Sequence, residues 1–246
     1  MSGDPVIIQG GMGVAVSNFR LAREVSRLGH LGVVSGTVLD QVFVRRLQDG
    51  DGDGEMRFAL DHFPFAEMAR RALDRFYIPG GKPARAPYIR LPQHTKTDDR
   101  ELRELCILSN FVEVFLARRG HSNPVGVNYL EKVQIPHLPS IYGAMLAGAG
   151  YVLMGAGIPV KIPGVLDAFV NHQPATYPLH VSGALDGDDV TMTFDPRDYV
   201  PVDLPPLERP KFLAIISSNV LAATMVKKSN GRVDGFVIEG PAAGGH

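Results

Sequence analysis

The sequence has one cysteine, no tryptophan, no long apolar run and almost no net charge. Cys106 has no partner for an internal disulfide, which fits a reducing compartment. Apolar runs end well short of the ~18 residues that span a membrane, and no signal peptide precedes them. The formal net charge is −1 and basic residues are scattered, which argues against a nucleic-acid partner. We therefore expect a cytoplasmic protein that binds neither membranes nor nucleic acid.

The sequence contains enough hydrophobic residues for one large core. Of its 246 residues, 45% are hydrophobic, so a core can form without disulfides. The 27 glycines and 19 prolines stay below the level typical of disorder. We expect residues 1–246 to form a single domain.

Short β-branched runs alternate with amphipathic stretches, which is typical of a parallel α/β fold. The predicted strands are residues 6–9, 31–35, 124–128, 151–154, 212–216 and 233–239. The predicted helices begin at Ser17 or Asn18 and end at Gly29, and then cover about 100–119, 138–147, 164–171 and 219–228. Residues 179–183 and 190–194, joined across Asp186–Asp188, predict a β-hairpin before the fifth strand.

Residues 37–98 interrupt this alternation and predict an insertion or a lid. They contain a predicted helix at 65–76 and a loop rich in Pro, Gly and Arg at 79–92. The acidic run at 49–55 imitates the start of a calcium loop, but its twelfth position is Leu60 where a Glu is required. We expect a flexible acidic surface turn there.

The strand count decides between two architectures. A (β/α)₈ TIM barrel closes with eight strands, and the sequence supplies about six. We therefore expect an incomplete TIM barrel, cut off at its C-terminus. An open doubly wound sheet of six strands remains the alternative.

Polar or glycine residues follow several predicted strands at the edge where barrel sites form. Gly10, Gly11 and Met12 follow the first strand; glycines there let the backbone approach a planar cofactor, although an ordinary tight turn explains them too. The dinucleotide-binding fingerprint fails, since Val16 stands where Gly or Ala is expected. Asn128 and Ser217 end the third and fifth strands, either as site residues or as satisfied turn residues.

Histidine and cysteine complete the candidate set. His246 lies on a glycine-rich loop after the sixth strand, where its unperturbed pKa of about 6.5 suits proton transfer, although a plain loop histidine explains it as well. Cys106 lies among apolar helix residues with no evident activating base, so we expect a buried core residue. The other histidines show no metal-ligand spacing, and we predict no metal site.

Taken in order, several motifs resemble the nitronate monooxygenase (2-nitropropane dioxygenase-like) family, whose relatives include FMN-dependent enoyl-acyl-carrier-protein reductases. They are residues 7–13 (IIQGGMG), the segment 21–36, residues 125–128 (VGVN), and residues 233–240 (VDGFVIEG) running into 243–246 (AGGH). The last is similar to the most specific signature of that family. Together these motifs span the whole chain.

The resemblance implies an FMN-binding TIM barrel. Gly10, Gly11 and Met12 would lie against the flavin ring and Asn128 would hydrogen-bond the cofactor, with Ser217 as a further contact. His246 would act over the reactive face as the base that removes a proton alpha to a nitro group. The sequence departs from the family at Ala242, where many members have Glu, and in lacking the later loops that hold the FMN phosphate.

Three functions follow from these expectations. The first is oxidation of alkyl nitronates with O₂ by an FMN-dependent nitronate monooxygenase. The second is NAD(P)H-dependent reduction of enoyl thioesters on a carrier protein in trans. The third is an inactive, truncated barrel fragment. The expected partners are FMN, a small-molecule substrate (a nitronate or an enoyl thioester) and O₂.

Overall fold

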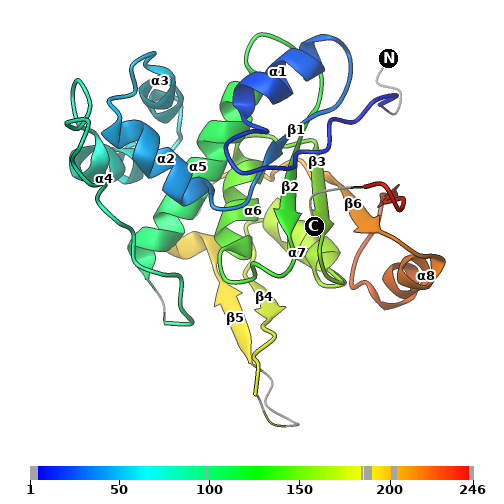
Figure 1. Ribbon diagram of the computed structural model, residues 1–246. Helices are drawn as coiled ribbons and strands as arrows, with labels where there is room; N and C mark the ends of the chain where they lie inside the picture. Colours follow the sequence, from blue (N-terminus) through cyan, green and yellow to red (C-terminus); the bar gives the residue numbers. More distant parts are fainter. Residues whose placement is uncertain (1–4, 98, 184, 186–189, 201–203, 244–246) are drawn as a thin grey trace.

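Five parallel strands form the main sheet in the order β1-β2-β3-β6-β7 (Figure 1). Neighbours in this sheet therefore follow one another along the chain, while β4 and β5 form a separate sheet. The computed structural model describes residues 5–97, 99–183, 185, 190–200 and 204–243. The strands are β1 Gly32–Ser35, β2 Val125–Leu130, β3 Tyr151–Gly155, β6 Lys211–Ile216 and β7 Gly235–Ile238. The α/β class and the parallel sheet predicted from the sequence are therefore confirmed.

The predicted first strand is much shorter than expected. Residues 6–9 contribute a single parallel bridge, from Ile8 to Leu31, beside β1. Backbone hydrogen bonds of 3.0 Å join Gln9 N to Leu31 O and Leu31 N to Ile7 O. Val6 is 90% exposed, because among the described residues this segment pairs only with the chain beside β1. This single bridge still places residues 6–9 as a short parallel neighbour beside the start of β1.

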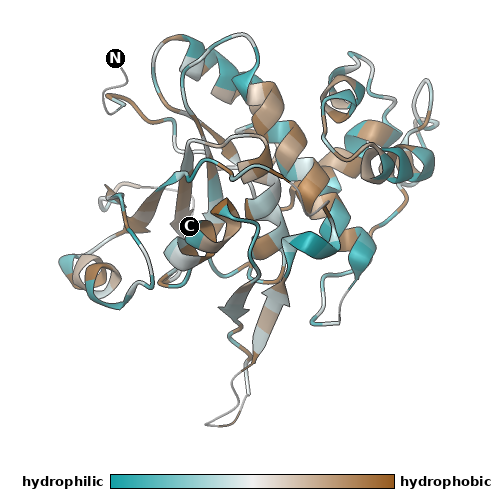
Figure 2. Cartoon of the chain, turned by 180° about the vertical axis from the view of Figure 1, so that it is seen from behind, coloured by the Kyte–Doolittle hydropathy of each residue, from teal (hydrophilic) through white to brown (hydrophobic). Residues whose placement is uncertain are grey.

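Helices join the strands and cover one face of the sheet. They are α1 Phe19–Arg27, α5 Arg100–Arg118, α6 His137–Leu146, α7 Ile162–Val170 and α8 Asn219–Lys228. Asn18, one of the two caps that the sequence predicts, caps α1 by accepting hydrogen bonds from the backbone N–H groups of Arg20 and Leu21. Figure 2 shows hydrophilic residues on the outward turns of α1. No helix in the described part of the chain has the length and apolar character needed to cross a membrane.

Residues 37–98 fold into three helices, of which the sequence predicted only the last. These are α2 Leu39–Gln48, α3 Glu55–Asp61 and α4 Ala66–Phe76, and they contact α5 on the side away from β6 and α8 (Figure 1). The acidic run is not a simple surface turn, because Asp51 is 5% exposed. Its carboxylate accepts hydrogen bonds from the N–H groups of Met56 and Arg57, which satisfies the first turn of α3.

The predicted hairpin exists with a different first strand. β4 Ala175–Pro178 pairs antiparallel with β5 Thr191–Phe194, followed by a 3₁₀ turn at Pro196–Asp198. Residues 179–183 are not a strand; the pairing extends past Pro178 only by the hydrogen bond from Leu179 N to Val190 O. The predicted turn at residues 186–188 lies outside the described residues.

The sheet separates two apolar clusters. The larger one lies between the sheet and the helices and includes Val34, Val127, Val152 and Phe212, all 0% exposed. The smaller lies on the opposite face, which we call the inner face. Its members are Leu31, Val33, Tyr151, Leu153, Leu213 and Ile215, with Val237 packed against them. Side chains alternate between the two faces along each strand.

Candidate functional site

The glycine-rich segment 9–13 lies against the inner face near the ends of β1 and β2 (Figure 1). Gly11 has φ +70°, a conformation that other residues rarely adopt. A Cβ on Gly11 would lie 2.5 Å from Val33 Cγ1 and 3.0 Å from Asn128 Cβ. Only glycine therefore allows this close approach of loop and sheet.

Side chains from both flanks hold this segment in place. Gln9 Oε1 accepts a hydrogen bond from Val33 N at 3.1 Å, and Gln9 Nε2 donates to Ser17 Oγ at 3.1 Å. Ser17 Oγ in turn donates to the carbonyl of Met12. Ser17 is buried, whereas Gly10 is exposed and Met12 half-buried. The turn is thus held by hydrogen bonds to buried groups, while Gly10 is exposed to solvent.

Asn128 brings a buried amide to the same place. It is 3% exposed and pairs in register with Ser35 on β1 and Leu153 on β3. Its Nδ2 donates to the carbonyl oxygen of Gly10 at 2.7 Å and to Met12 Sδ at 3.1 Å. Its buried Oδ1 has no hydrogen-bond donor within the described residues. Leaving such an oxygen unsatisfied costs about 1–3 kcal/mol.

The structure thus brings together four of the six sequence-predicted site residues: Gly10, Gly11, Met12 and Asn128. Ser217 is exposed directly after β6, where Ser218 caps α8 by accepting from Leu221 N. β6 is separated from β2 by one strand, and Asn128 is level with Leu153 and Leu213 in the register. Ser217 follows Leu213 by four residues, so it lies roughly 10 Å across the sheet from Asn128 and roughly 13 Å further along the strand direction. His246 lies outside the described residues.

A cavity of ≈ 520 Å³ opens beyond the C-terminal ends of β1 and β2. Its wall includes apolar Val38, Leu91 and Ile135 together with polar Asp40 and His94. Val38 has φ +59°, which for a β-branched residue is strained by about 1–3 kcal/mol. Cavities of about 300–1,000 Å³ are the size of small-molecule sites. Sequence reasoning missed this one, because segment 37–98 forms much of its wall.

A buried network fixes the β2–α6 loop, which forms the opposite wall of the cavity. Glu131 is 6% exposed and accepts hydrogen bonds from Tyr177 Oη at 2.9 Å and from Gln134 Nε2 at 3.3 Å. Burial, together with the charge of Glu131, raises the pKa of Tyr177. His137 Nε2 donates to the carbonyl of Leu130 at 3.0 Å, and burial lowers the pKa of its imidazole. This wall is therefore held by internal bonds.

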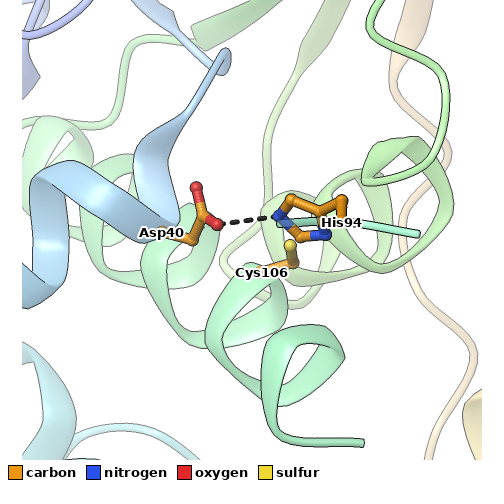
Figure 3. A group of neighbouring side chains, drawn as sticks. All are labelled: Asp40, His94 and Cys106. Carbon is orange, nitrogen blue, oxygen red and sulfur yellow. Dashed lines mark hydrogen bonds and ion pairs between the residues drawn. The ribbon is translucent and has the colours of Figure 1, made fainter. Parts of the chain in front are cut away.

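Asp40, His94 and Cys106, three residue types that bind metals, lie close together, as Figure 3 shows. Asp40 and His94 also line the cavity. Asp40 lies in the first turn of α2, His94 in the irregular segment before α5, and Cys106 on α5. His94 Nε2 donates to Asp40 Oδ2 at 2.8 Å. Burial, and secondarily the Asp40 charge, holds the pKa of the Cys106 thiol well above its usual range. Cys106 is buried as predicted, but it lies beside a histidine and a carboxylate that the sequence did not connect to it.

Comparison with known proteins adds no identification. No model of a known protein family matches the chain, and no curated protein is significantly similar to it. Function is therefore argued from the geometry described above and from the resemblance of the sequence motifs.

Proposed function

We propose that this chain is an FMN-dependent oxidoreductase whose parallel sheet belongs to a (β/α)₈ barrel. The strand order follows the chain without the reversal that defines a doubly wound sheet. The inner face carries its own small apolar cluster, as the packed interior of a barrel does. The glycine turn and Asn128 lie at the C-terminal edge of the strands, where barrel enzymes bind their ligands.

The single observation that carries this proposal is the unpartnered Oδ1 of Asn128 beneath the glycine turn. A flavin ring presents an N–H between two carbonyl groups along one edge. That N–H would donate to Asn128 Oδ1 and so satisfy the buried oxygen. Gly10 and Gly11 would lie against the ring, because neither carries a side chain that would keep the ring away from the backbone. Met12 would contact the ring beside them. Ser217 would supply a polar contact further along the edge.

Nitronate oxidation is the activity we favour for this site. Bound FMN would supply the redox chemistry and the activation of O₂. With a neutral nitroalkane, His246 would accept the proton from the carbon alpha to the nitro group, leaving the nitronate. With a preformed nitronate no proton transfer is needed, so His246 would matter less. The packed inner face would keep water away from the reacting atoms.

Enoyl thioester reduction is the second candidate, and the cavity favours it. Its volume of ≈ 520 Å³ and its apolar side chains would accommodate an acyl chain beside the same strand edge. NAD(P)H would supply the hydride in that reaction.

Two assays on the FMN-loaded chain test the proposal. We expect O₂ consumption with an alkyl nitronate and no oxidation of NAD(P)H with an enoyl thioester. The reverse result would replace the monooxygenase by the reductase. A chain that binds no FMN and catalyses neither reaction would overturn both.

His246→Ala tests the proposed base separately. It should lower turnover of a neutral nitroalkane by about 10²–10⁴-fold while FMN binding and turnover of preformed nitronate persist. Equal rates of the variant and the wild type with the nitroalkane would contradict the role of His246.

A further inference from the structure

We propose that Asp40, His94 and Cys106 bind a divalent transition-metal cation of the Zn²⁺ class at the edge of the cavity. The inference does not depend on the flavin or on the proposed reaction. Its basis is the meeting of these three side chains from α2, the segment before α5, and α5 itself (Figure 3).

The donor set selects this class of cation. A thiolate, an imidazole and a carboxylate offer one sulfur, one nitrogen and one oxygen. Zn²⁺ accepts all three donors, whereas Ca²⁺ and Mg²⁺ are coordinated almost entirely by oxygen. With Cys106 as thiolate and Asp40 ionised, the set carries two negative charges, which balance a divalent cation. The thiol proton leaves to solvent when the metal–sulfur bond forms.

The distances fall close to those of a coordination sphere. One ligand atom of each residue lies within 4.8 Å of the other two. In a tetrahedral site with bonds of about 2.0–2.3 Å, ligand atoms lie about 3.3–3.8 Å apart. Closing the difference needs an inward shift of about 1 Å. His94 is half-buried on a segment without helix or strand, so its side chain has the most freedom to supply that shift.

Burial and position also suit a metal site. Asp40 is 4% exposed and Cys106 2% exposed, so neither ligand would be lost to competing water. Asp40 and His94 both line the ≈ 520 Å³ cavity. A cation on the three residues would thus have two of its ligands on the wall of that cavity, from which a water or substrate could supply the fourth. Without a cation, the same residues amount to a hydrogen-bonded Asp40–His94 pair beside the buried Cys106 side chain.

Cobalt titration separates these two states. Co²⁺ is the probe, added to the metal-free chain, because a thiolate on Co²⁺ gives an absorption band in the near ultraviolet. Cys106 is the only cysteine among the 246 residues, so this band can arise from no other thiol of the chain. We expect a band that saturates at one Co²⁺ per chain and disappears when Zn²⁺ is added.

Variants assign the other two ligands. Cys106→Ser should lose the band, and Asp40→Asn and His94→Gln should each weaken Co²⁺ binding at least tenfold. His180→Gln is the matched control, since His180 lines the same cavity outside the cluster and its loss should change nothing. Circular dichroism checks that each variant folds. Zn²⁺ should raise the Tm of the wild type and of His180→Gln but not that of Cys106→Ser.

Two results would overturn the proposal. One is the absence of a thiolate band in the folded wild type at excess Co²⁺. The other is unchanged Co²⁺ affinity in folded Asp40→Asn and His94→Gln variants, which would leave the cysteine without the partners that define the site.

Discussion

The two faces of the parallel sheet use the same strands in different ways. The helix-covered face is mostly apolar, with Val34, Val127 and Phe212 each fully buried, and its buried Tyr129 hydroxyl is satisfied by Asn110. The inner face interrupts its smaller apolar cluster with a glycine turn and with Asn128, whose oxygen lacks a partner among the described residues. The difference teaches that one face holds most of the apolar core, while the other contains a buried oxygen without a partner among the described residues. We propose that a ligand satisfies this oxygen.

The largest expected loss of stability comes from shortening a buried side chain on the helix-covered face. Phe212→Ala removes a fully buried aromatic side chain from β6, and such changes cost about 3–5 kcal/mol of unfolding free energy. Urea denaturation measures the loss. Ile238→Ala on β7 is the control, because Ile238 is 78% exposed and its truncation should cost less than about 0.5 kcal/mol. A similar cost at both positions would contradict the assignment of stability to this face.

The second largest expected loss of stability comes from adding a side chain in the glycine turn. Gly11→Ala combines a left-handed backbone with a Cβ 2.5 Å from Val33 Cγ1, so we expect a loss of about 2–4 kcal/mol. Gly29→Ala carries a similar φ of +85° with nothing within 4 Å, and should cost only about 1 kcal/mol. The difference between the two variants in urea measures the close approach of the loop to the sheet. Equal costs would mean that the loop does not lie against Val33.

The smallest expected effect is on how the unfolding free energy depends on pH, through His137 in the wall of the cavity. Burial lowers the pKa of His137, so the unfolded chain binds a proton more readily than the folded one. The stabilisation is complete above the unfolded pKa of about 6.5 and is lost as the pH falls toward the folded pKa. His137→Gln should therefore flatten the dependence of unfolding free energy on pH in that window. His180→Gln, at an exposed histidine, should leave it as steep as in the wild type.

Much of the fold follows from local sequence signals. β-Branched runs placed β1, β2, β3 and β6 within two residues, because such runs pair well in a buried parallel sheet. The helix predicted at 219–228 coincides with α8, which starts at the Ser218 cap. Signals of this kind depend only on neighbours along the chain.

The missed helices lack a side-chain cap at the residue directly before each helix. α2 begins after Val38 and α3 after Gly54, and neither residue provides a side-chain capping bond. Both helices are stabilised by packing against α5, which a local pattern does not contain. The strand predicted at 6–9 has the local signal, because its β-branched residues are present. It does not form a full strand, because it pairs with one neighbour among the described residues and its first residue is exposed.

The candidate site divides in the same way. Gly11 and Asn128 could be brought together from sequence, since the ends of parallel strands meet at one edge. Asp40, His94 and Cys106 could not, because their meeting depends on how α2 and the segment before α5 pack around α5. No spacing along the chain encodes that arrangement.

Titration of the chain with FMN, followed by flavin fluorescence, tests the central claim most directly. We expect one FMN per chain and at least a tenfold weaker affinity in Asn128→Leu, which corresponds to about 1.4 kcal/mol. Asn110→Leu is the control, because Asn110 is equally buried on α5 but bonds Tyr129 Oη and the carbonyl of Cys106 instead of the glycine turn. Equal FMN affinity in the folded wild type and Asn128→Leu, or no binding by the wild type, would contradict a flavin site on the inner face.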